Sequence, residues 1–385
     1  MFSAIDENPA GAATRPRKPV PLIWAFQTEK TGDNAQIDTL LRALDLPVTI
    51  KRLRMQERWQ VKKPRIRPGI GQLDRDASDP LEPPWPDLVV LSGRCSMNVA
   101  LWLRQQSSGR TCLVLIGRPH GHYEAFDLIV AAPQFRLPAR ANVINLDLPL
   151  ITPPLAAIGE AAACWRDDLA ALPRPITAVL VGGPTHQSRF DSQAAQVLID
   201  RTLAAIAGVG TLYVSTSRRT PEAVTRALAG ALPSSARLFR WAPGAVDNPY
   251  LALLSLADRF VVTGDSASML VEVARLGRPL AVFELPVGRG PRQCLARLRA
   301  LFGHLRWPGH GARPRRDITE LHRTLYRMGL AVPLGEPFPA DSGISGAHAQ
   351  LAAIRSRIHT LLGLSAGEQP PAIRSADNPD RQRHA

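Results

Sequence analysis

The chain has 385 residues, of which 45% are hydrophobic, and a formal net charge of +14. This composition is typical of a globular protein, and the length favours two domains over a single core. No apolar run approaches the roughly 18 residues of a transmembrane helix, and the N-terminus lacks the apolar core of a secretory signal. We therefore expect a cytoplasmic protein.

The first half predicts strands that alternate with helices. Residues 1–20 read as a disordered arm, and residues 21–150 as a first Rossmann-like domain. Short apolar runs rich in β-branched residues mark its expected strands, at 21–27, 48–54, 87–93, 111–117, 126–132 and 142–149.

The alternation restarts after residues 151–172, a proline-bearing segment and helix that we expect to link the halves. Residues 173–330 predict a second Rossmann-like domain, and residues 331–385 a C-terminal helix with a disordered tail. Its expected strands are 176–183, 211–217, 237–242, 259–264 and 279–285. The expected fold is thus α/β, with two doubly wound domains facing a cleft. In such sheets, ligands bind beyond the carboxyl ends of the strands.

Two expected turns of the second half could receive a phosphate. Gly182 and Gly183 would let the backbone approach a ligand, with Thr185 close behind, although a tight turn without ligand explains them equally. The next turn carries Ser217, Arg218 and Arg219 before a helix expected to start at Pro221 under a Thr220 cap. Arginines at a helix N-terminus are unfavourable unless an anion is bound, so these two are either solvated or ligand-binding.

A third turn, in VVTGDSASMLVEVARLGRPLAVFEL (261–285), ends an apolar run. Asp265 or Ser266 is suited to cap the helix that follows. Ser268 and Glu272 would share the face of Asp265, where a carboxylate can accept hydrogen bonds from sugar hydroxyls. The alternative is that Glu272 is an ordinary solvated side chain.

The first half offers Asp33, after the first strand, as a helix cap or as a general base. His120 and His122 form an H-x-H pair without a visible third ligand, so no metal site is expected. Cys95, Cys112 and Cys164 fit buried free thiols in a reducing compartment.

Residues 51–67 hold eight Lys and Arg side chains and one acid, with Trp59 and Met55 between them. This segment suits an anionic membrane surface, on the inner membrane face, or is a solvated loop. No nucleic-acid-binding motif is present, and we expect no nucleic-acid partner.

Several of these motifs together carry a family resemblance: KTGDNAQ, PWPDLVVLSGR, VGGPT, STSRRTP, NPYLALLSLAD and VTGDSASMLVEVARLGRPLAVFEL. They resemble the elongated-mitochondria-type fission protein family over residues 21–305. That family is similar to GT-B glycosyltransferases, in which the C-terminal domain holds a nucleotide sugar and the N-terminal domain the acceptor. Residues 263–283 also resemble the donor-binding turn of lipopolysaccharide heptosyltransferases, but Asp265-Ser266-Ala267 stands where those enzymes have Asp-Thr-Gly, and the histidine they often carry shortly afterwards is absent.

The resemblance implies a glycosyltransferase-like enzyme that needs neither a metal nor a cofactor beyond its nucleotide-sugar substrate. Asp33 would be the base, acting on an envelope glycan or lipid-linked acceptor. The diphosphate would contact the turns at 182–185, 217–219 and 265–268, and Glu272 the ribose or sugar hydroxyls. The alternative is a non-catalytic protein of the same shape that recruits a partner at membranes.

Overall fold

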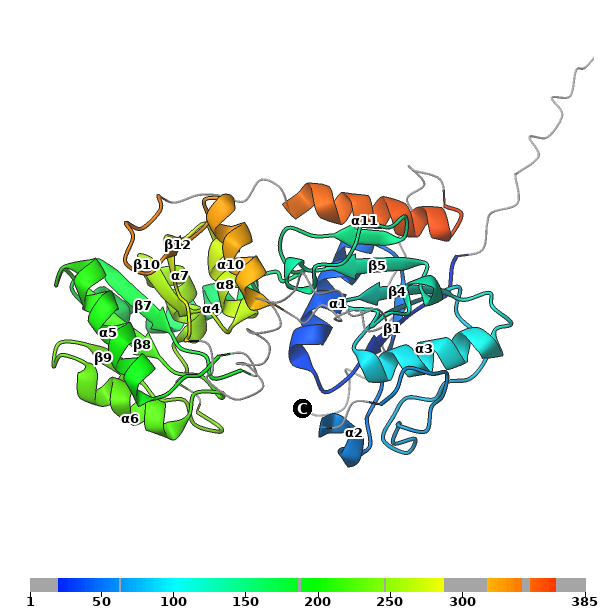
Figure 1. The fold of residues 1–385 in the computed structure, drawn as a ribbon, viewed down its shortest axis with the longest axis horizontal. Coiled ribbons are helices and arrows are strands. Elements are labelled where there is room, and N and C mark those ends of the chain that lie inside the picture. The colour runs from blue at the N-terminus through cyan, green and yellow to red at the C-terminus, as the bar shows by residue number, and fades with distance from the viewer. Residues whose placement is uncertain are drawn as a thin grey trace, which may run out of the picture.

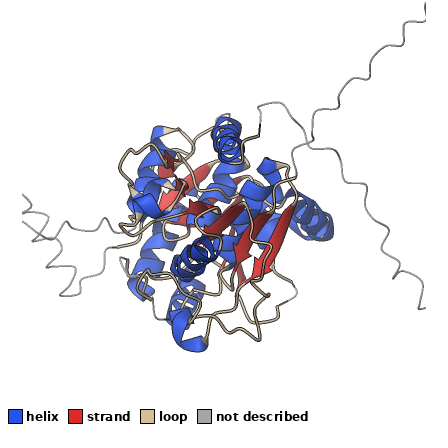
Figure 2. Cartoon of the chain, turned by 90° about the vertical axis from the view of Figure 1, so that its right-hand side faces the viewer, coloured by secondary structure: helices blue, strands red, loops and turns tan. Residues whose placement is uncertain are grey.

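A computed structural model describes residues 20–61, 64–185, 188–245, 247–286, 317–340 and 347–364. Residues 1–19 of the arm expected at 1–20 and the tail from 365 lie outside these ranges, as does Cys294. Two lobes lie side by side, each built on one sheet (Figure 1). Figure 2 shows the strands with helices around them, which is the arrangement that keeps a sheet of parallel strands away from water.

The first sheet has six parallel strands in the order β2-β1-β3-β4-β5-β6. Its strands are short and apolar, and those at its centre are buried on both faces. Their bounds are β1 (Ile23–Gln27), β2 (Val48–Arg52), β3 (Leu88–Ser92), β4 (Cys112–Ile116), β5 (Leu128–Ala131) and β6 (Val143–Asn145). The helices between them are α1 (Thr31–Leu44), α2 (Glu57–Val61) and α3 (Arg94–Gln106), with 3-10 turns η1 (Tyr123–Ala125) and η2 (Pro133–Phe135).

The second sheet also has six parallel strands, in the order β12-β11-β10-β7-β8-β9. Helix α4 (Leu155–Ala170) leads into it. The strands are β7 (Ile176–Leu180), β8 (Thr211–Ser215), β9 (Arg237–Phe239), β10 (Arg259–Thr263), β11 (Leu280–Phe283) and β12 (Val332–Pro333). The helices are α5 (Ser192–Ile206), α6 (Glu222–Ala231), α7 (Tyr250–Leu256), α8 (Ala267–Arg275) and α10 (Ile318–Arg327). The predicted α/β architecture of two doubly wound halves is confirmed, while the exact domain boundaries stay a prediction.

Helix α11 (Ala347–Leu361) follows the second lobe in sequence but lies across the first (Figure 1). Ile354 and Ile358 are fully buried in the cluster that also holds Ile37 and Leu40 of α1. Asp147 and Gln350 hydrogen-bond across the same contact. The C-terminal helix predicted within 331–385 therefore completes the core of the first lobe.

The lobes also meet where η2 contacts α10. Asp317 N–H donates to the Gln134 carbonyl at 2.8 Å, and Arg136 pairs with both Asp317 and Glu320. Arg275 of α8 adds a bond to the Pro149 carbonyl at 3.2 Å. Polar contacts of this kind tie the second lobe to the first near the elements that follow β10.

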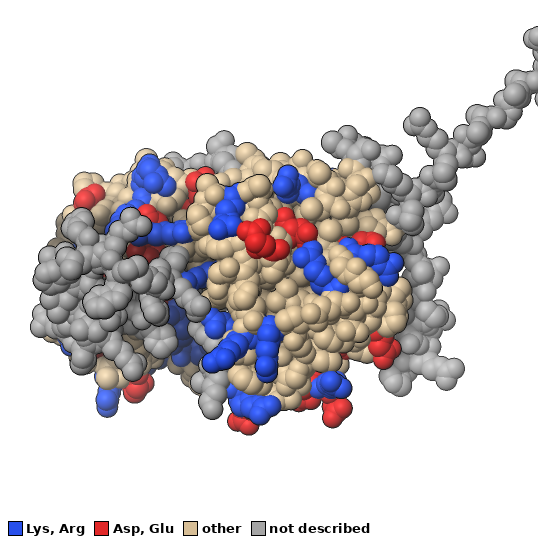
Figure 3. All heavy atoms as spheres, turned by 45° about the vertical axis from the view of Figure 1, so that its right-hand side comes forward, with Lys and Arg blue, Asp and Glu red and all other residues tan. Residues whose placement is uncertain are grey.

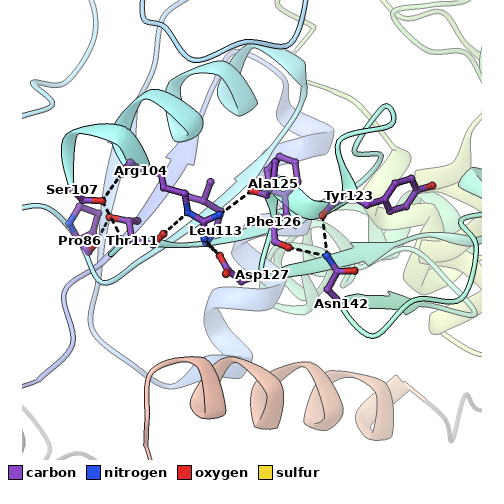
Figure 4. A network of polar contacts seen from close by, with 10 residues as sticks. All are labelled: Pro86, Arg104, Ser107, Thr111, Leu113, Tyr123, Ala125, Phe126, Asp127 and Asn142. Atoms are coloured by element: carbon purple, nitrogen blue, oxygen red, sulfur yellow. Dashed lines mark hydrogen bonds and ion pairs between the residues drawn. The ribbon is translucent and has the colours of Figure 1, made fainter. Parts of the chain in front are cut away.

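A polar network lies at the amino-terminal edge of the first sheet, where its strands begin (Figure 4). Arg104 of α3 pairs with Asp127, and its guanidinium also donates to the carbonyls of Thr111 and Ala125 at 3.0 and 3.2 Å. A cavity of about 450 Å³ beside it is lined by residues that include Asp127 and Asn142. These residues precede β5 and β6, so they lie away from the edge where doubly wound sheets bind ligands, and we assign them a structural role.

Candidate functional site

The strand order reverses between β7 and β10 of the second sheet, which pair directly. Chain segments leaving two such strands turn to opposite faces of the sheet, and this leaves a crevice at their carboxyl ends. The turn at Gly182 and Gly183 and the turn at Asp265 leave these two strands. Sequence reasoning placed both at one sheet edge, and the structure makes them immediate neighbours.

Asp265 turns inward and joins the two turns. Its side chain is completely buried, and Oδ2 accepts from the Gly183 N–H at 2.9 Å and pairs with the Arg219 guanidinium at 2.7 Å. Among the described residues, its Oδ1 has no hydrogen-bond partner. A buried carboxylate needs partners such as the Gly183 N–H and Arg219 to offset the loss of its hydration. Asp265 therefore fixes the geometry of the site from beneath.

The two glycines are needed by this packing. A Cβ on Gly182 would stand 2.2 Å from Asp265 Oδ2, and a Cβ on Gly183 would stand 2.1 Å from the Arg219 carbonyl oxygen. Real Cβ atoms do not approach that closely. The close contacts within the protein explain both glycines, so their presence alone does not indicate a ligand.

The sequence predicted that Thr220 caps α6, and this prediction is wrong. The helix begins at Glu222 with Pro221 as its N-cap residue. The Thr220 hydroxyl instead donates to the Gly182 carbonyl at 2.7 Å and accepts from the Ser217 N–H at 2.9 Å. The Thr220 hydroxyl is not available to cap α6, because its hydrogen bonds join the turn after β7 to the turn after β8.

The remaining polar residues of these turns divide into two groups. The Thr185 hydroxyl is 2.8 Å from that of Ser188 and lies within its own loop, and the Ser217 hydroxyl is 3.2 Å from that of Thr220. Arg218, by contrast, is exposed, and no ion pair or hydrogen bond of its side chain occurs within the described part of the chain. Of the two predicted arginines, Arg219 serves Asp265 and Arg218 extends into solvent.

Helix α8 starts at this edge with Ser266 as its N-cap residue, buried to 4% exposure. The Ser266 side chain makes no capping hydrogen bond. Asp265, the other expected cap, is turned toward Gly183, so the predicted side-chain cap is wrong. The first N–H groups of α8 thus lack a side-chain acceptor, and Ser268 lies exposed among them.

Glu272 lies half-buried on α8 and accepts a hydrogen bond from the Tyr250 hydroxyl of α7. Burial raises the pKa of the Glu272 carboxyl, and the bond from Tyr250 offsets part of that rise. Burial and the adjacent carboxylate raise the pKa of Tyr250 well above its ordinary value. Glu272 is therefore not the solvated side chain of the alternative interpretation. It does not share a helix face with Asp265, because Asp265 precedes α8 and its side chain bonds to Gly183.

His322 of α10 is a residue that sequence reasoning missed. It is 3% exposed, and its Nε2 lies 2.7 Å from the Gly264 carbonyl oxygen, which requires an Nε2–H donor. Its Nδ1 lies 3.6 Å from Glu284 Oε1. Burial lowers the pKa of His322 despite that carboxylate. A Cβ on Gly264 would fall 2.6 Å from the imidazole, so the Gly264 turn is shaped to this histidine. The two residues are 58 positions apart in the sequence, so no local pattern could reveal the contact.

The first sheet has its own reversal between β1 and β3. Asp33 lies there, in the first turn of α1, with Oδ2 3.4 Å from the position of a Cβ on Gly93. The N-cap residue of α1 is Lys30, so Asp33 is not the cap. Its predicted role as a base remains a prediction.

Comparison with known proteins bears on the whole arrangement. Residues 31–309 match the family described as Mitochondrial fission ELM1. The chain belongs to this family. Its carboxyl-edge turns at 182–183 and 264–266 and Asp33 all fall within the matched range.

Two curated relatives match parts of the chain. One is the Mitochondrial fission protein ELM1 of Arabidopsis thaliana, 29% identical over 219 residues, or 51% of each chain. The chain thus spans about half the length of that relative. The other is the Uncharacterized protein RP120 of Rickettsia prowazekii, 24% identical over 302 residues, covering 69% of this chain and 83% of that protein.

Three solved structures with which the chain shares its overall fold are as follows. They are the S. aureus MnaA–UDP co-structure (11% identity, 91% of this chain and 99% of that chain, TM-score 0.45), a putative UDP-N-acetylglucosamine 2-epimerase from Listeria monocytogenes (11%, 90% and 98%, 0.49) and a ugt transferase from Siraitia grosvenorii in complex with UDP (13%, 89% and 92%, 0.40). All three scores lie below 0.5, and the ligands named with these structures are ligands of those proteins.

The basic segment 51–67 of this ELM1-family chain lies at the first lobe. Leu53 and Met55 are buried, and Trp59 packs against the core of the lobe. Figure 3 shows basic side chains in small groups, with acidic side chains and uncharged atoms between them. The exposed arginines of the segment are Arg52, Arg54, Arg58, Arg65 and Arg67. In the described part of this segment, these five arginines are thus exposed while Leu53 and Met55 are buried.

Three other expectations meet the structure here. Cys95 and Cys112 are partly buried but Cys164 is exposed, because it lies on the outer side of α4, so the prediction of a buried thiol is wrong there. His120 Nδ1 accepts from Arg94 at 2.9 Å. Within the described ranges no cluster of His, Cys, Asp or Glu suits a metal ion, and no helix is long and apolar enough to span a membrane.

Proposed function

We propose that the second lobe binds a nucleoside diphosphate sugar, with the diphosphate at the start of α8. The observation that carries this proposal is the uncapped N-terminus of α8 at the strand reversal between β7 and β10. Free N–H groups and the helix dipole there favour an anion. Exposed Ser268 adds a hydroxyl donor at the same place.

The neighbouring side chains then take separate roles. Arg218, exposed in the next turn, would reach the phosphates and stabilise the leaving diphosphate, where preorganised positive charge is most effective. Asp265 and Arg219 would hold the turns without touching the ligand, with Gly182 and Gly183 packed against them. Ser217 and Thr185 would line the edge. Glu272 would accept hydrogen bonds from ribose or sugar hydroxyls.

The reaction we propose is sugar transfer to an envelope glycan or a lipid-linked acceptor held by the first lobe. Asp33 would take the proton of the acceptor hydroxyl. The acceptor oxygen would bond to the anomeric carbon as the bond from that carbon to the diphosphate breaks. The negative charge left on the diphosphate would be met by the start of α8 and by Arg218.

Calorimetry with UDP, GDP and their sugars tests the binding step. Arg218→Ala should weaken binding about tenfold, because a hydrogen bond to a charged group is worth roughly 1.5–3 kcal/mol. Arg226→Ala is the matched control, since Arg226 is also exposed but lies within α6. Absence of heat with the whole ligand panel would refute the proposal, and equal binding by both variants would refute the role of Arg218.

A substitution of opposite sign isolates the start of α8. Ser268→Glu places a carboxylate at the helix N-terminus, where it interacts favourably with the dipole but repels phosphate. We expect the Tm to hold or rise while nucleotide affinity falls at least tenfold. Ser268→Ala should change both much less. If Ser268→Glu binds nucleotide as well as the unaltered chain does, the diphosphate is not at α8.

A second function, recruitment to an anionic membrane surface through residues 51–67, is favoured by the five exposed arginines and by the name of the Arabidopsis relative. Because Trp59 packs inward, binding would be electrostatic and salt-sensitive. Co-sedimentation with anionic vesicles tests it: replacing Arg54 and Arg58 by Gln should abolish binding that the unaltered chain shows. Undiminished binding would exclude this segment.

A further inference from the structure

A cavity of about 200 Å³ opens at the carboxyl edge of the first sheet, beside the strand reversal between β1 and β3. It is far larger than one water needs. Its walls come from the turn after β1, from α2 and from the start of α3, which lie in the first lobe (Figure 1). None of the nucleotide-binding residues proposed above lines it.

Three polar atoms of its lining residues are buried and have no hydrogen-bond partner in the described structure. They are Trp59 Nε1, Arg94 Nε and Ser96 Oγ. Ser96 is only 1% exposed, so its hydroxyl has no access to bulk water. A polar group that is buried without a hydrogen-bond partner destabilises the fold. All three belong to residues that line one cavity, so a ligand bound there is in a position to pair with them.

Backbone donors of α3 join these side chains. The first backbone bond of the helix runs from Met97 N–H to the Gly93 carbonyl at 3.1 Å. The N–H groups of Arg94, Cys95 and Ser96 precede that bond. Gly93, the N-cap residue, has a φ of 85° and no side chain with which to cap them. The positive end of the helix dipole therefore faces the cavity that Ser96 lines.

Among the side chains that line the cavity, those with nitrogen donors outnumber those with carboxylates. The indole and guanidinium nitrogens can only donate, and Lys30 adds a cation at the rim. Of the lining residues only Glu29 carries a carboxylate, and its Oε1 already accepts from the Met55 N–H at 3.0 Å. The carboxylate of Asp33 lies next to the lining residue Gly93, with Oδ2 3.4 Å from the position of a Cβ there. The guanidinium of Arg94 is held in place by His120 at 2.9 Å. A fixed arginine, an indole N–H and a helix N-terminus suit a compact oxyanion.

We infer that this cavity is a binding site for a phosphate group, held by Trp59, Arg94, Ser96 and the first turn of α3. It is a separate site in the other lobe and does not depend on nucleotide binding by α8. The phosphate belongs either to a soluble phosphomonoester or to a lipid headgroup, since both present the same oxyanion.

The test is calorimetry with inorganic phosphate and glycerol 3-phosphate in the full chain carrying Ser268→Glu, which silences the start of α8. We expect saturable binding that Trp59→Phe and Ser96→Ala each weaken about tenfold, because each removes one hydrogen bond to a charged group. Trp59→Phe keeps an aromatic ring against the core. Glu29→Gln should strengthen binding severalfold, since it removes a negative charge and keeps an oxygen for the Met55 N–H.

The unliganded Ser96→Ala variant supplies a check against simple misfolding. Its Tm should equal or exceed that of the parent chain, because the hydroxyl it loses has no partner. Lost phosphate binding with an undiminished Tm supports the site. No binding of either phosphate by the parent chain, or equal binding by parent, Trp59→Phe and Ser96→Ala, overturns it.

Vesicles of phosphatidylcholine with and without phosphatidic acid separate the two sources of phosphate. If glycerol 3-phosphate releases the chain from phosphatidic acid vesicles, the ligand is a headgroup. If the chain binds glycerol 3-phosphate but does not bind phosphatidic acid vesicles, the ligand is a soluble phosphomonoester. Both results require the Ser96→Ala effect, so both support the site. In the chain without Ser268→Glu, Ser96→Ala should leave UDP binding by the second lobe unchanged.

Discussion

The buried carboxylate of Asp265 and the half-exposed guanidinium of Arg219 meet at 2.7 Å across the ends of two strands that are separated by β7. The pair links the turn after β10 to the turn after β8, and the Gly183 N–H bonds to the same oxygen. We expect Asp265→Asn to destabilise the fold by about 1–2 kcal/mol and Asp265→Ala by about 3 kcal/mol, because both remove the carboxylate that pairs with Arg219 and alanine also leaves the buried Gly183 N–H without its acceptor. Urea unfolding measures both. Exposed Asp200→Asn should stay within about 0.5 kcal/mol, and an equal effect there would contradict this role.

Gly183→Ala should cost about 1–3 kcal/mol by overpacking, since its Cβ would meet the Arg219 carbonyl oxygen at 2.1 Å. Gly159→Ala is the matched control. Nothing lies within 4 Å of the added carbon, and Gly159 is exposed in α4. Alanine there should stabilise by about 0.5–1 kcal/mol, the usual difference in a helix. Denaturant titration of both variants measures these free energies of unfolding. A Gly183→Ala variant as stable as the natural chain would show that the turn is not tightly packed.

Glu272 predicts a pH-dependent difference in stability. Its pKa is raised in the folded state, so the folded state holds this proton more tightly and the associated stability is lost as pH rises through the folded pKa. Glu272→Gln removes that loss while keeping an acceptor for Tyr250. The variant should therefore gain on the natural chain between about pH 4.3, the unfolded value, and pH 7. Thermal unfolding across this range tests it, and a constant difference between the two chains would refute it.

The same variant should bind nucleotide sugars more weakly if Glu272 contacts their hydroxyls. Greater stability at neutral pH together with lower affinity would show that the carboxylate is retained for a ligand. Unchanged affinity would leave Glu272 as a partner of Tyr250 only.

For His322 we expect stability to change with pH in the opposite direction. Burial lowers its pKa in the fold, so the unfolded chain takes up the proton first, at about pH 6.5, and stability is lost as pH falls through the folded pKa. Glu284 and Asp317 are the carboxylates that oppose this shift. His322→Gln can still donate to the Gly264 carbonyl but does not titrate. We expect it to lose less stability than the natural chain from pH 7 to pH 5, and parallel curves would contradict this account.

Helix α11 should be required by the first lobe. Ile358→Ala removes a fully buried side chain from the contact with α1 and should cost about 2–5 kcal/mol. Ser356, exposed on the same helix, is the control, and Ser356→Ala should stay within about 0.5 kcal/mol. Equal stability of the two variants in guanidinium unfolding would mean that α11 does not complete this core.

Most of the fold could be predicted from the sequence, because short apolar runs between Gly-, Pro- and Ser-rich turns mark buried parallel strands wherever they occur. The turns that end at Gly182, Ser217 and Asp265 were predicted at one edge for the same reason. The predicted strand at 237–242 is shorter in the structure, at Arg237–Phe239, since an edge strand has a partner on only one side. The return of α11 to the first lobe carries no local signal.

What the sequence determined by itself was the alternation of elements and the polar residues at their ends, since both follow from local propensity and hydrophobic pattern. What the tertiary structure decided was the partner of each polar atom. Asp265 bonds to Gly183 and Arg219 rather than capping α8, Thr220 bridges two turns rather than capping α6, and His322 reaches Gly264 across 58 residues. A hydrogen bond depends on atoms within about 3 Å, and only the packed chain brings residues distant in sequence that close.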